Sequence, residues 1–359
     1  MTLGYFSLAR AFSSAHVFLP TRRLLITALV AFVFGPFAGA VFAQAEVNVY
    51  TSRHYDSDAL LYAMFEEATG IHVNAIQGGE DELIERLRSE GRNSPADIFF
   101  TADAGRLWRA EQAGLLQQVS SDVLEAAIPA NLRHPDGLWF GLSRRARVIV
   151  YHRANVDTPP TTYEDLADEA WRGRVCVRSS SNIYNQSLVA SLIEHHGADE
   201  AEAWGRGLVA NFARPPEGND TAQVRAVAVG QCDVALVNHY YLARLLTSTD
   251  PADAAVVETV GMVFPNQDGR GTHVNISGAG VTRSAPHREN AIRFLEFLVT
   301  PEAQAVFVRE NFEYPVVEGV PHPAVLDGFG PFVADVLDVT AYGRNNPAAV
   351  MLMDRVGWR

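Results

Sequence analysis

Two hydrophobic periods alternate along the first part of the chain. The run "EVNVYTS" (46–52) alternates apolar and polar residues as a half-buried strand does, whereas "SDALLYAMFEEATG" (57–70) gathers its apolar residues on one helical face. Gly70 is suited to end that helix, because glycine accepts a left-handed backbone. Another strand (71–77), another helix and a third strand (96–103) follow. This β-α-β-α-β order predicts a parallel sheet with helices on both faces.

The same alternation restarts in the middle of the chain. There the run "PPTTYEDLADEAW" (159–171) is typical of a capped helix. Near the end, Pro301 falls in the first turn of a predicted helix, where proline is tolerated. The restart of βα units predicts a second α/β lobe. The other elements predicted here are β-rich runs over 138–153, 173–180, 232–238 and 273–282, and helices over 185–197, 221–230 and 288–300.

Two β-rich segments, near 146–152 and 275–282, are candidates for chain crossings between the two lobes. Paired crossings would give an α/β molecule with hinged lobes around a central cleft. Ligands of open α/β sheets bind beyond the carboxyl ends of the strands, and in two lobes those ends can face one cleft. The predicted N-terminal lobe is 46–147 with 275–322, and the predicted C-terminal lobe is 148–274 with 323–359.

The N-terminus has the features of an export signal. Residues 1–23 contain three arginines and no acid, and an apolar run over 24–43 ends in the small-residue sequences "VFA" and "AQA". We therefore predict a signal peptide over 1–45, cleaved near 43–45. A membrane anchor is the alternative, but Gly35-Pro36 interrupts the run. The sequence "TRRLLI" (21–26) suits a twin-arginine signal, and an ordinary secretory signal is equally compatible.

Net charge limits the partners that the protein can bind, and the cysteine content bears on a possible disulfide. Removing residues 1–45 would change the net charge from −13 to −16, which argues against nucleic acid as a partner because phosphates would be repelled. Cys176 and Cys232 each lie in a short β-like run. An exported chain with two cysteines can form one disulfide, and two buried free thiols are the alternative.

Polar aromatic residues gather at three predicted strand-to-helix turns. His54 and Tyr55 follow the first strand, Tyr184 precedes the helix over 185–197, and Tyr240 with Tyr241 follows the strand over 232–238. Phenolate is a hard oxygen ligand, and a highly charged cation such as Fe³⁺ can displace its proton at neutral pH. The pattern thus favours a ferric site. An exposed tyrosine pair that stacks on a sugar or an organic cation is the alternative.

Longer stretches resemble a known family. The segments "NVYTSRHYDSD", "NSPADIFFTADAGRLWRAEQAGLLQ", "DGLWFGLSRRARVIVYHR", "RSSSNIYNQSLVASLI", "VNHYYLARL" and "HVNISGAGVT" together resemble the periplasmic ferric-iron-binding proteins of ABC-type importers, from about residue 46 to 320. The resemblance implies a type II-like two-lobed periplasmic binding-protein fold. It implies a monomer that carries Fe³⁺ as cargo to an inner-membrane ABC permease.

The resemblance also implies the ligands. Tyr55, Tyr184, Tyr240 and Tyr241 are the expected phenolates, and His54, water or an anion would complete the shell. Four phenolates would favour Fe³⁺ over Fe²⁺ on charge. The residues expected to surround the ligands are Arg53, Arg144, Arg145, Asn219 and Asp220.

Two other functions fit parts of the sequence. A binding protein of the same fold could take an oxyanion, a polyamine or a phosphonate, but its turns would carry arginines or carboxylates where this chain has tyrosines. A non-haem iron enzyme could use "HYD" (54–56) with His239 or His273, but that site belongs to β-barrel folds. No Walker, G-x-G-x-x-G, C-x-x-C or H-E-x-x-H motif is present, so we expect a binding protein and not an enzyme.

Overall fold

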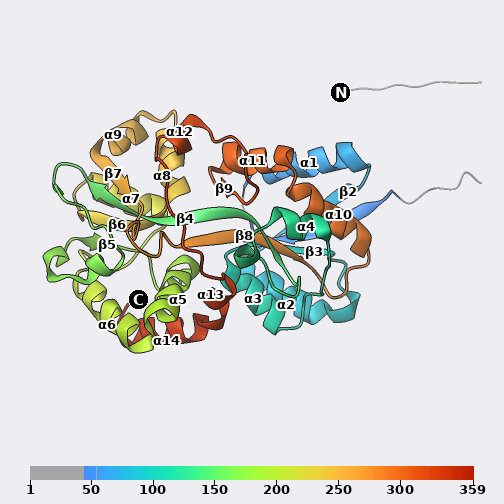
Figure 1. The fold of residues 1–359 in the computed structure, drawn as a ribbon, viewed down its shortest axis with the longest axis horizontal. Coiled ribbons are helices and arrows are strands. Elements are labelled where there is room, and N and C mark those ends of the chain that lie inside the picture. The colour runs from blue at the N-terminus through green and yellow to red at the C-terminus, as the bar shows by residue number, and fades with distance from the viewer. Residues whose placement is uncertain (1–43, 54) are drawn as a thin grey trace, which may run out of the picture. The chain divides into compact units, whose positions relative to one another are not determined.

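The described strands form one continuous sheet (Figure 1). The structure is a computed structural model that describes residues 44–53 and 55–359. The predicted signal peptide over 1–45 lies almost wholly outside the described residues. None of the described helices combines the length and the apolar character needed to cross a membrane. The strands are β1 (Glu46–Thr51), β2 (His72–Gln77), β3 (Ile98–Ala102), β4 (Phe140–His152), β5 (Val175–Cys176), β6 (Val234–Asn238), β7 (Val260–Val263), β8 (Val274–Val281) and β9 (Tyr314–Pro315).

Helices follow most of the strands, as the alternating pattern predicts. The α-helices are α1 (Asp58–Thr69), α2 (Glu80–Glu90), α3 (Ala104–Gln112), α4 (Asp122–Ala127), α5 (Ile183–His196), α6 (Ala198–Ala210), α7 (Asp220–Ala228), α8 (His239–Leu246), α9 (Pro251–Thr259), α10 (Arg288–Leu298), α11 (Pro301–Asn311), α12 (Ala324–Asp327), α13 (Thr340–Arg344) and α14 (Asn346–Arg355). Pro301 is the first residue of α11, which confirms that prediction. Gly70 adopts the left-handed conformation, with φ 71°, and ends α1.

The order of the sheet is β2-β1-β3-β8-β4-β6-β5, and β7 and β9 also pair with β4. β1 lies parallel to both β2 and β3, which confirms the predicted β-α-β-α-β unit. β5 lies parallel to β6. We call β1, β2, β3 and β8 the first group of strands and β5, β6 and β7 the second group. Because parallel neighbours end at the same edge of a sheet, the turns after β1 and β3 open on one side.

β4 belongs to both groups of strands. Its first half, from Phe140 to Ala146, pairs with β8, and its second half, from Arg147 to Tyr151, pairs with β6. Figure 1 shows β4 and β8 running side by side through the middle of the described chain. The strand therefore carries the backbone from one group of strands to the other without a loop between them.

Apolar side chains form three buried clusters around this sheet. One contains Phe65, Phe99 and Phe294 beside the first group of strands. The other two flank the second group, and one of them includes Trp204 and Trp358. Each group of strands therefore packs against its own buried apolar cluster or clusters.

The helix predicted over 159–171 is wrong. The structure has two short 3₁₀ turns there, Glu164–Ala167 and Glu169–Trp171. The side chain of Asn211, directly after α6, takes carbonyls that a helix would use, because its Nδ2 donates to the oxygens of Leu166 and Asp168. Tertiary hydrogen bonds thus replace the local helical pattern at this segment.

Candidate metal centre

The four tyrosines predicted as ligands lie at the starts of helices. Tyr55 lies in the turn between β1 and α1, and Tyr184 is the second residue of α5. Asn182 caps α5, since its side-chain oxygen accepts a hydrogen bond from the Tyr184 N–H at 3.2 Å. Tyr240 and Tyr241 are the second and third residues of α8, which directly follows β6. These strand-to-helix turns come from both groups of strands.

Arg244 brings three of these rings together. Its guanidinium carbon lies 5.0 Å from the ring centroid of Tyr55, 5.1 Å from that of Tyr240 and 5.9 Å from that of Tyr241. The centroids of the two adjacent tyrosines are 4.3 Å apart. A tyrosine from the first group of strands therefore meets the pair from the second across one arginine.

Arg145 joins the fourth ring, that of Tyr184, to the ring of Tyr240. This side chain is buried on β4, and its guanidinium carbon lies 5.6 Å from the ring centroid of Tyr184 and 5.9 Å from that of Tyr240. Arg145 is one of the residues predicted to surround the ligands, and it lies beside two of the tyrosine rings. Its positive charge favours the phenolate forms of Tyr240 and Tyr55.

Burial opposes ionisation of these phenols. It raises the pKa of Tyr241 to about 12, and burial with the adjacent phenols raises the pKa of Tyr240 well above its ordinary value. The pKa of Tyr55 is also raised, first by burial and then by the charge of Glu313. Without a cation these three rings are therefore neutral phenols at pH 7.

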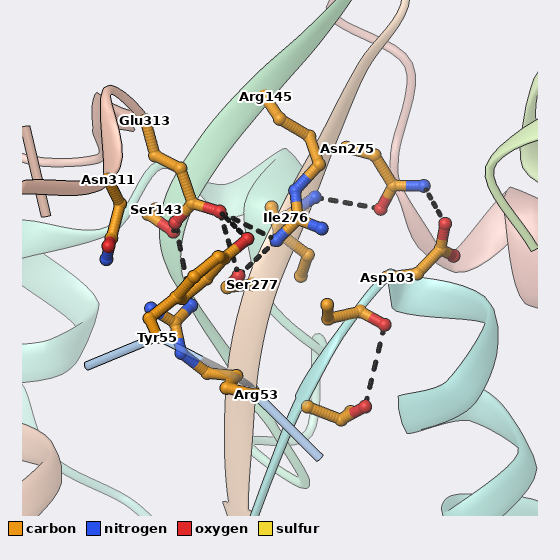
Figure 2. A network of polar contacts seen from close by, with 12 residues as sticks. Arg53, Tyr55, Asp103, Ser143, Arg145, Asn275, Ile276, Ser277, Asn311 and Glu313 are labelled. Carbon is orange, nitrogen blue, oxygen red and sulfur yellow. Dashed lines mark hydrogen bonds and ion pairs between the residues drawn. The ribbon is translucent and has the colours of Figure 1, made fainter. Parts of the chain in front are cut away.

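Glu313 holds the phenol of Tyr55 (Figure 2). Its carboxylate is fully buried, and Oε1 accepts a hydrogen bond from the Tyr55 hydroxyl at 3.1 Å. The Ser143 hydroxyl donates to Oε2 at 2.5 Å, and Arg145 Nη2 lies 3.1 Å from Oε1. Burial alone would raise the pKa of Glu313, but the guanidinium groups of Arg145 and Arg53 hold it below its usual range.

Arg53 anchors the turn that carries Tyr55. Its Nε and Nη2 donate to both oxygens of Asp58, at 3.0 and 3.1 Å, in a forked pair. Its Nη1 lies 3.5 Å from Glu313 Oε2, and its guanidinium carbon lies 4.5 Å from the Tyr55 ring centroid. The predicted Arg53 thus packs beside the cluster as a buried cation.

Asp220 fixes the start of the helix that carries the tyrosine pair. It accepts hydrogen bonds from Arg147 Nη1 at 2.7 Å and from the backbone N–H of Asn238 at 2.8 Å. Arg178 lies 3.4 Å from its other oxygen and 5.6 Å from the Tyr184 ring centroid. This predicted residue therefore joins the turns of α5, α7 and α8.

Three other predicted residues lie elsewhere or outside the described chain. Asn219 caps α7 by accepting a hydrogen bond from the Ala222 N–H at 2.9 Å. Arg144 points to the face of β4 opposite Arg145, where its Nε donates to the Pro315 oxygen at 2.9 Å. His54 lies outside the described residues.

Sequence reasoning missed three residues of the cluster. Arg244 could have been found, because it lies one helical turn after Tyr240 and Tyr241 on α8. Arg178 follows the short strand β5, and only its position six residues before Tyr184 connects it to the site. Glu313 lies in "NFEYPVV", far along the chain, and no pattern in the sequence connects it to Tyr55.

The cluster is accessible from one side. A cavity of about 480 Å³ is lined by Tyr55, Ser57, Leu60, Arg244 and Asn311. Tyr55, Tyr184 and Tyr241 are only half-buried, whereas Tyr240 is buried. A solute can therefore reach Tyr55 and Arg244 from this cavity.

The two histidines considered for an enzyme site have other contacts. His239 is buried, accepts a hydrogen bond from the Ala146 N–H at 3.1 Å and donates one to the Phe312 oxygen at 2.8 Å. His273 is buried against the ring of Tyr342, with centroids 4.7 Å apart. Within residues 44–53 and 55–359, no group of three or more His, Cys, Asp or Glu side chains is arranged to hold a metal ion.

Cys176 and Cys232 form a disulfide, with Cα atoms 5.8 Å apart. Cys176 ends β5, and Cys232 lies two residues before β6, its parallel neighbour. The bridge closes the segment that contains α5, α6 and α7, including Tyr184.

Comparisons with known proteins agree with this arrangement. Residues 93–330 match the family described as bacterial extracellular solute-binding protein. Iron uptake protein A1 of Synechocystis sp. is 52% identical over 325 residues, covering 90% of each chain, and iron uptake protein A2 is 54% identical over 337 residues, covering 93% of this chain and 96% of the relative. The solved structure of Trichodesmium IdiA (FutA) in complex with iron and citrate ligands is 60% identical, with a TM-score of 0.86, and covers 88% of this chain and all of that one.

The family match over 93–330 includes the turns that carry Tyr184, Tyr240 and Tyr241. The fold is therefore the two-lobed α/β fold of periplasmic binding proteins, as the sequence predicts. The chain belongs to the bacterial extracellular solute-binding protein family, among relatives that include iron uptake proteins A1 and A2.

Proposed function

We propose that this protein captures ferric iron through the phenolates of Tyr55, Tyr184, Tyr240 and Tyr241 and delivers it to an ABC permease. The observation that carries the proposal is the meeting of four phenols from three separate turns around Arg145 and Arg244. The names of its relatives, iron uptake proteins A1 and A2, support iron as the cargo. The protein acts by binding and release, without catalysis.

Charge balance explains the choice of cation. Four phenolates against Fe³⁺ leave one negative charge, which the adjacent Arg145 and Arg244 offset. The buried phenols keep their protons in the absence of a strong cation, because burial raises the pKa of Tyr241 to about 12. Only a cation that attracts phenolate strongly displaces these protons at neutral pH. Cations that polarise phenol only weakly are therefore excluded, because they cannot displace the protons that Tyr55, Tyr240 and Tyr241 retain.

Capture proceeds in two stages. Tyr184, Tyr240 and Tyr241 belong to the lobe we assign to 148–274 and 323–359, and they bind iron first. Closure of the other lobe, 46–147 with 275–322, then adds Tyr55. Tyr55 must give up its hydrogen bond to Glu313 in this step, and His54, water or an anion completes the shell.

Iron capture in the periplasm requires that the chain be exported. The signal peptide over 1–45 directs the chain to the periplasm through the secretory or the twin-arginine route. There the loaded protein docks as a monomer on an inner-membrane permease. Reopening of the lobes, reduction of the iron or protonation of the phenolates releases the cargo.

A visible absorption spectrum tests the proposal. Iron-free mature protein is loaded with chelated Fe³⁺, and we expect a new broad visible band from phenolate-to-iron charge transfer. Tyr240→Phe and Tyr241→Phe should each weaken iron binding by at least about tenfold, since each removes one charged ligand. Tyr151→Phe is the matched control, because the Tyr151 hydroxyl makes no hydrogen bond to any described residue.

The opposite results identify the alternatives. A protein that stays colourless after stripping and reloading is not a ferric-tyrosinate protein. Retained binding of an oxyanion, polyamine or phosphonate in Tyr240→Phe would then assign the cleft to another solute.

A further inference from the structure

A second pocket lies behind the metal centre, on the opposite face of β4. Side chains alternate along a strand, so Arg145 faces the tyrosines while Arg144 faces away. Arg144 is directly opposite Tyr314 on the antiparallel strand β9, and both side chains therefore point to the same side. They line a cavity of about 420 Å³, which lies within the usual size of small-molecule sites. We call this cavity the reverse pocket.

Arg144 has unused donors at the wall of this pocket. Its Nε donates to the Pro315 oxygen at 2.9 Å. Its two terminal nitrogens make no hydrogen bond, and no carboxylate lies within ion-pair distance, among the residues that the structure describes. Burial lowers the pKa of Arg144, and the neighbouring Tyr314 and Glu318 offset this only in part. A half-buried guanidinium with free terminal donors at the wall of a cavity is a ready partner for an anion that enters it.

Tyr314 provides the second observation. Its side chain is only 4% exposed, and its hydroxyl has no hydrogen-bond partner in the described chain. Buried hydroxyl groups nearly always have a partner, and one without a partner points to an absent ligand or water. The hydroxyl and the free edge of Arg144 together match the two oxygens of a carboxylate.

Two of the other lining side chains, His322 and Phe332, are aromatic. The ring of Phe332 lies 5.1 Å from that of Tyr314 and stacks on Phe264 at 4.3 Å, and the ring of His322 lies 5.5 Å from that of Tyr314. Flat walls of this kind favour an aromatic body.

One acidic residue limits the charge that the pocket accepts. Asp327 also lines the cavity, but its side chain is 66% exposed and lies 3.7 Å from His322 Nδ1. Its charge is therefore at the rim and partly shared with the histidine. A dianion such as phosphate would be repelled more strongly by this carboxylate than a monoanion would be.

We propose that the reverse pocket binds a small aromatic monocarboxylate, with its carboxylate on Arg144 and the Tyr314 hydroxyl and its ring against Phe332. The site is separate from the proposed iron site, because none of its residues is a proposed iron ligand. It is nonetheless adjacent in sequence to two residues that contact the tyrosines, since Tyr314 follows Glu313 and Arg144 precedes Arg145.

In the experiment, iron-free mature protein is titrated with benzoate, and binding is measured by calorimetry or ligand-observed NMR. We expect saturable binding that benzamide, the neutral analogue of the same shape, does not reproduce. Arg144→Gln should weaken benzoate binding by about tenfold or more, the effect of losing a charged hydrogen bond. Arg283→Gln is the matched control, because Arg283 lines a different cavity, of about 320 Å³, and binding should be unchanged.

Tyr314→Phe keeps the test decisive if Arg144→Gln does not fold. This variant loses only a hydroxyl without a partner, so it should fold and bind benzoate several-fold more weakly. The proposal is overturned if the wild-type protein shows no saturable binding, if benzamide binds equally well, or if both variants bind benzoate as the wild type does.

Discussion

The Tyr55 hydroxyl donates a hydrogen bond to Glu313 Oε1 at 3.1 Å, across 258 positions of the sequence. Glu313 also accepts from Ser143 and lies between the guanidinium groups of Arg53 and Arg145. One buried carboxylate therefore orients a proposed iron ligand and balances two buried cations. Under the proposed function, iron must compete with Glu313 for Tyr55, which would link occupancy of the site to the residue that precedes β9.

Glu313→Gln should destabilise the iron-free protein by about 3 kcal/mol, because removing one member of a buried ion network leaves the others uncompensated. Urea unfolding measures this free energy. Glu289→Gln is the control, since Glu289 pairs with Arg288 at the surface and its side chain is 83% exposed. That control should show no resolvable change. Equal stability of Glu313→Gln and wild type would mean that the buried arginines need no carboxylate.

Iron binding should release protons. Tyr55, Tyr240 and Tyr241 are protonated in the iron-free protein at pH 7, because burial raises the pKa of each. Binding through these three phenolates must therefore release at least three protons, and the affinity must fall as the pH is lowered. A pH-stat titration with chelated Fe³⁺, corrected for the chelate alone, counts them.

The count should drop by about one in Tyr241→Phe, which lacks one of these phenols. It should be unchanged in Tyr151→Phe, which carries its substitution outside the cluster. Proton release that is the same in Tyr241→Phe as in wild type would rule out phenolate ligation by that residue.

Periodicity was sufficient to predict the repeating βα units, because strand and helix periods are local properties. It failed over 159–171, where Asn211 takes the carbonyls of Leu166 and Asp168. No local pattern can report a hydrogen bond from more than forty residues away. The tyrosine turns were predictable for a related reason, since each follows a strand whose end must face the cleft.

The surroundings of the tyrosines were less predictable. Arg144 and Arg145 are adjacent and chemically alike, and only the register of β4 decides which faces the phenols. Glu313 reaches Tyr55 through the pairing of β9 with β4, a contact that sequence spacing does not encode. The arginines and the carboxylate that tune the site therefore required the structure.

Breaking the disulfide should reduce stability without removing the fold. Cys176 and Cys232 are 56 positions apart, and a bridge that closes a loop of this size stabilises a protein by about 2–4 kcal/mol. The double variant Cys176→Ser, Cys232→Ser should lose this free energy in urea unfolding. Added reductant should then destabilise the wild type but leave the double variant unchanged. A response of the double variant to reductant would point to a different cause.

Acid should destabilise the protein through a buried histidine. Burial lowers the pKa of His273 to about 3, and the adjacent charge of Arg147 contributes. The unfolded chain binds a proton near pH 6.5, whereas the folded chain does not, so stability is complete above that pH and falls as the pH drops towards 3. Between pH 7 and pH 5 this residue alone should cost about 2 kcal/mol. His273→Phe keeps a ring against Tyr342 and cannot titrate, so its unfolding free energy should depend less on pH. The comparison is made by urea unfolding at both pH values, and equal losses in wild type and variant would show that other groups drive the acid transition.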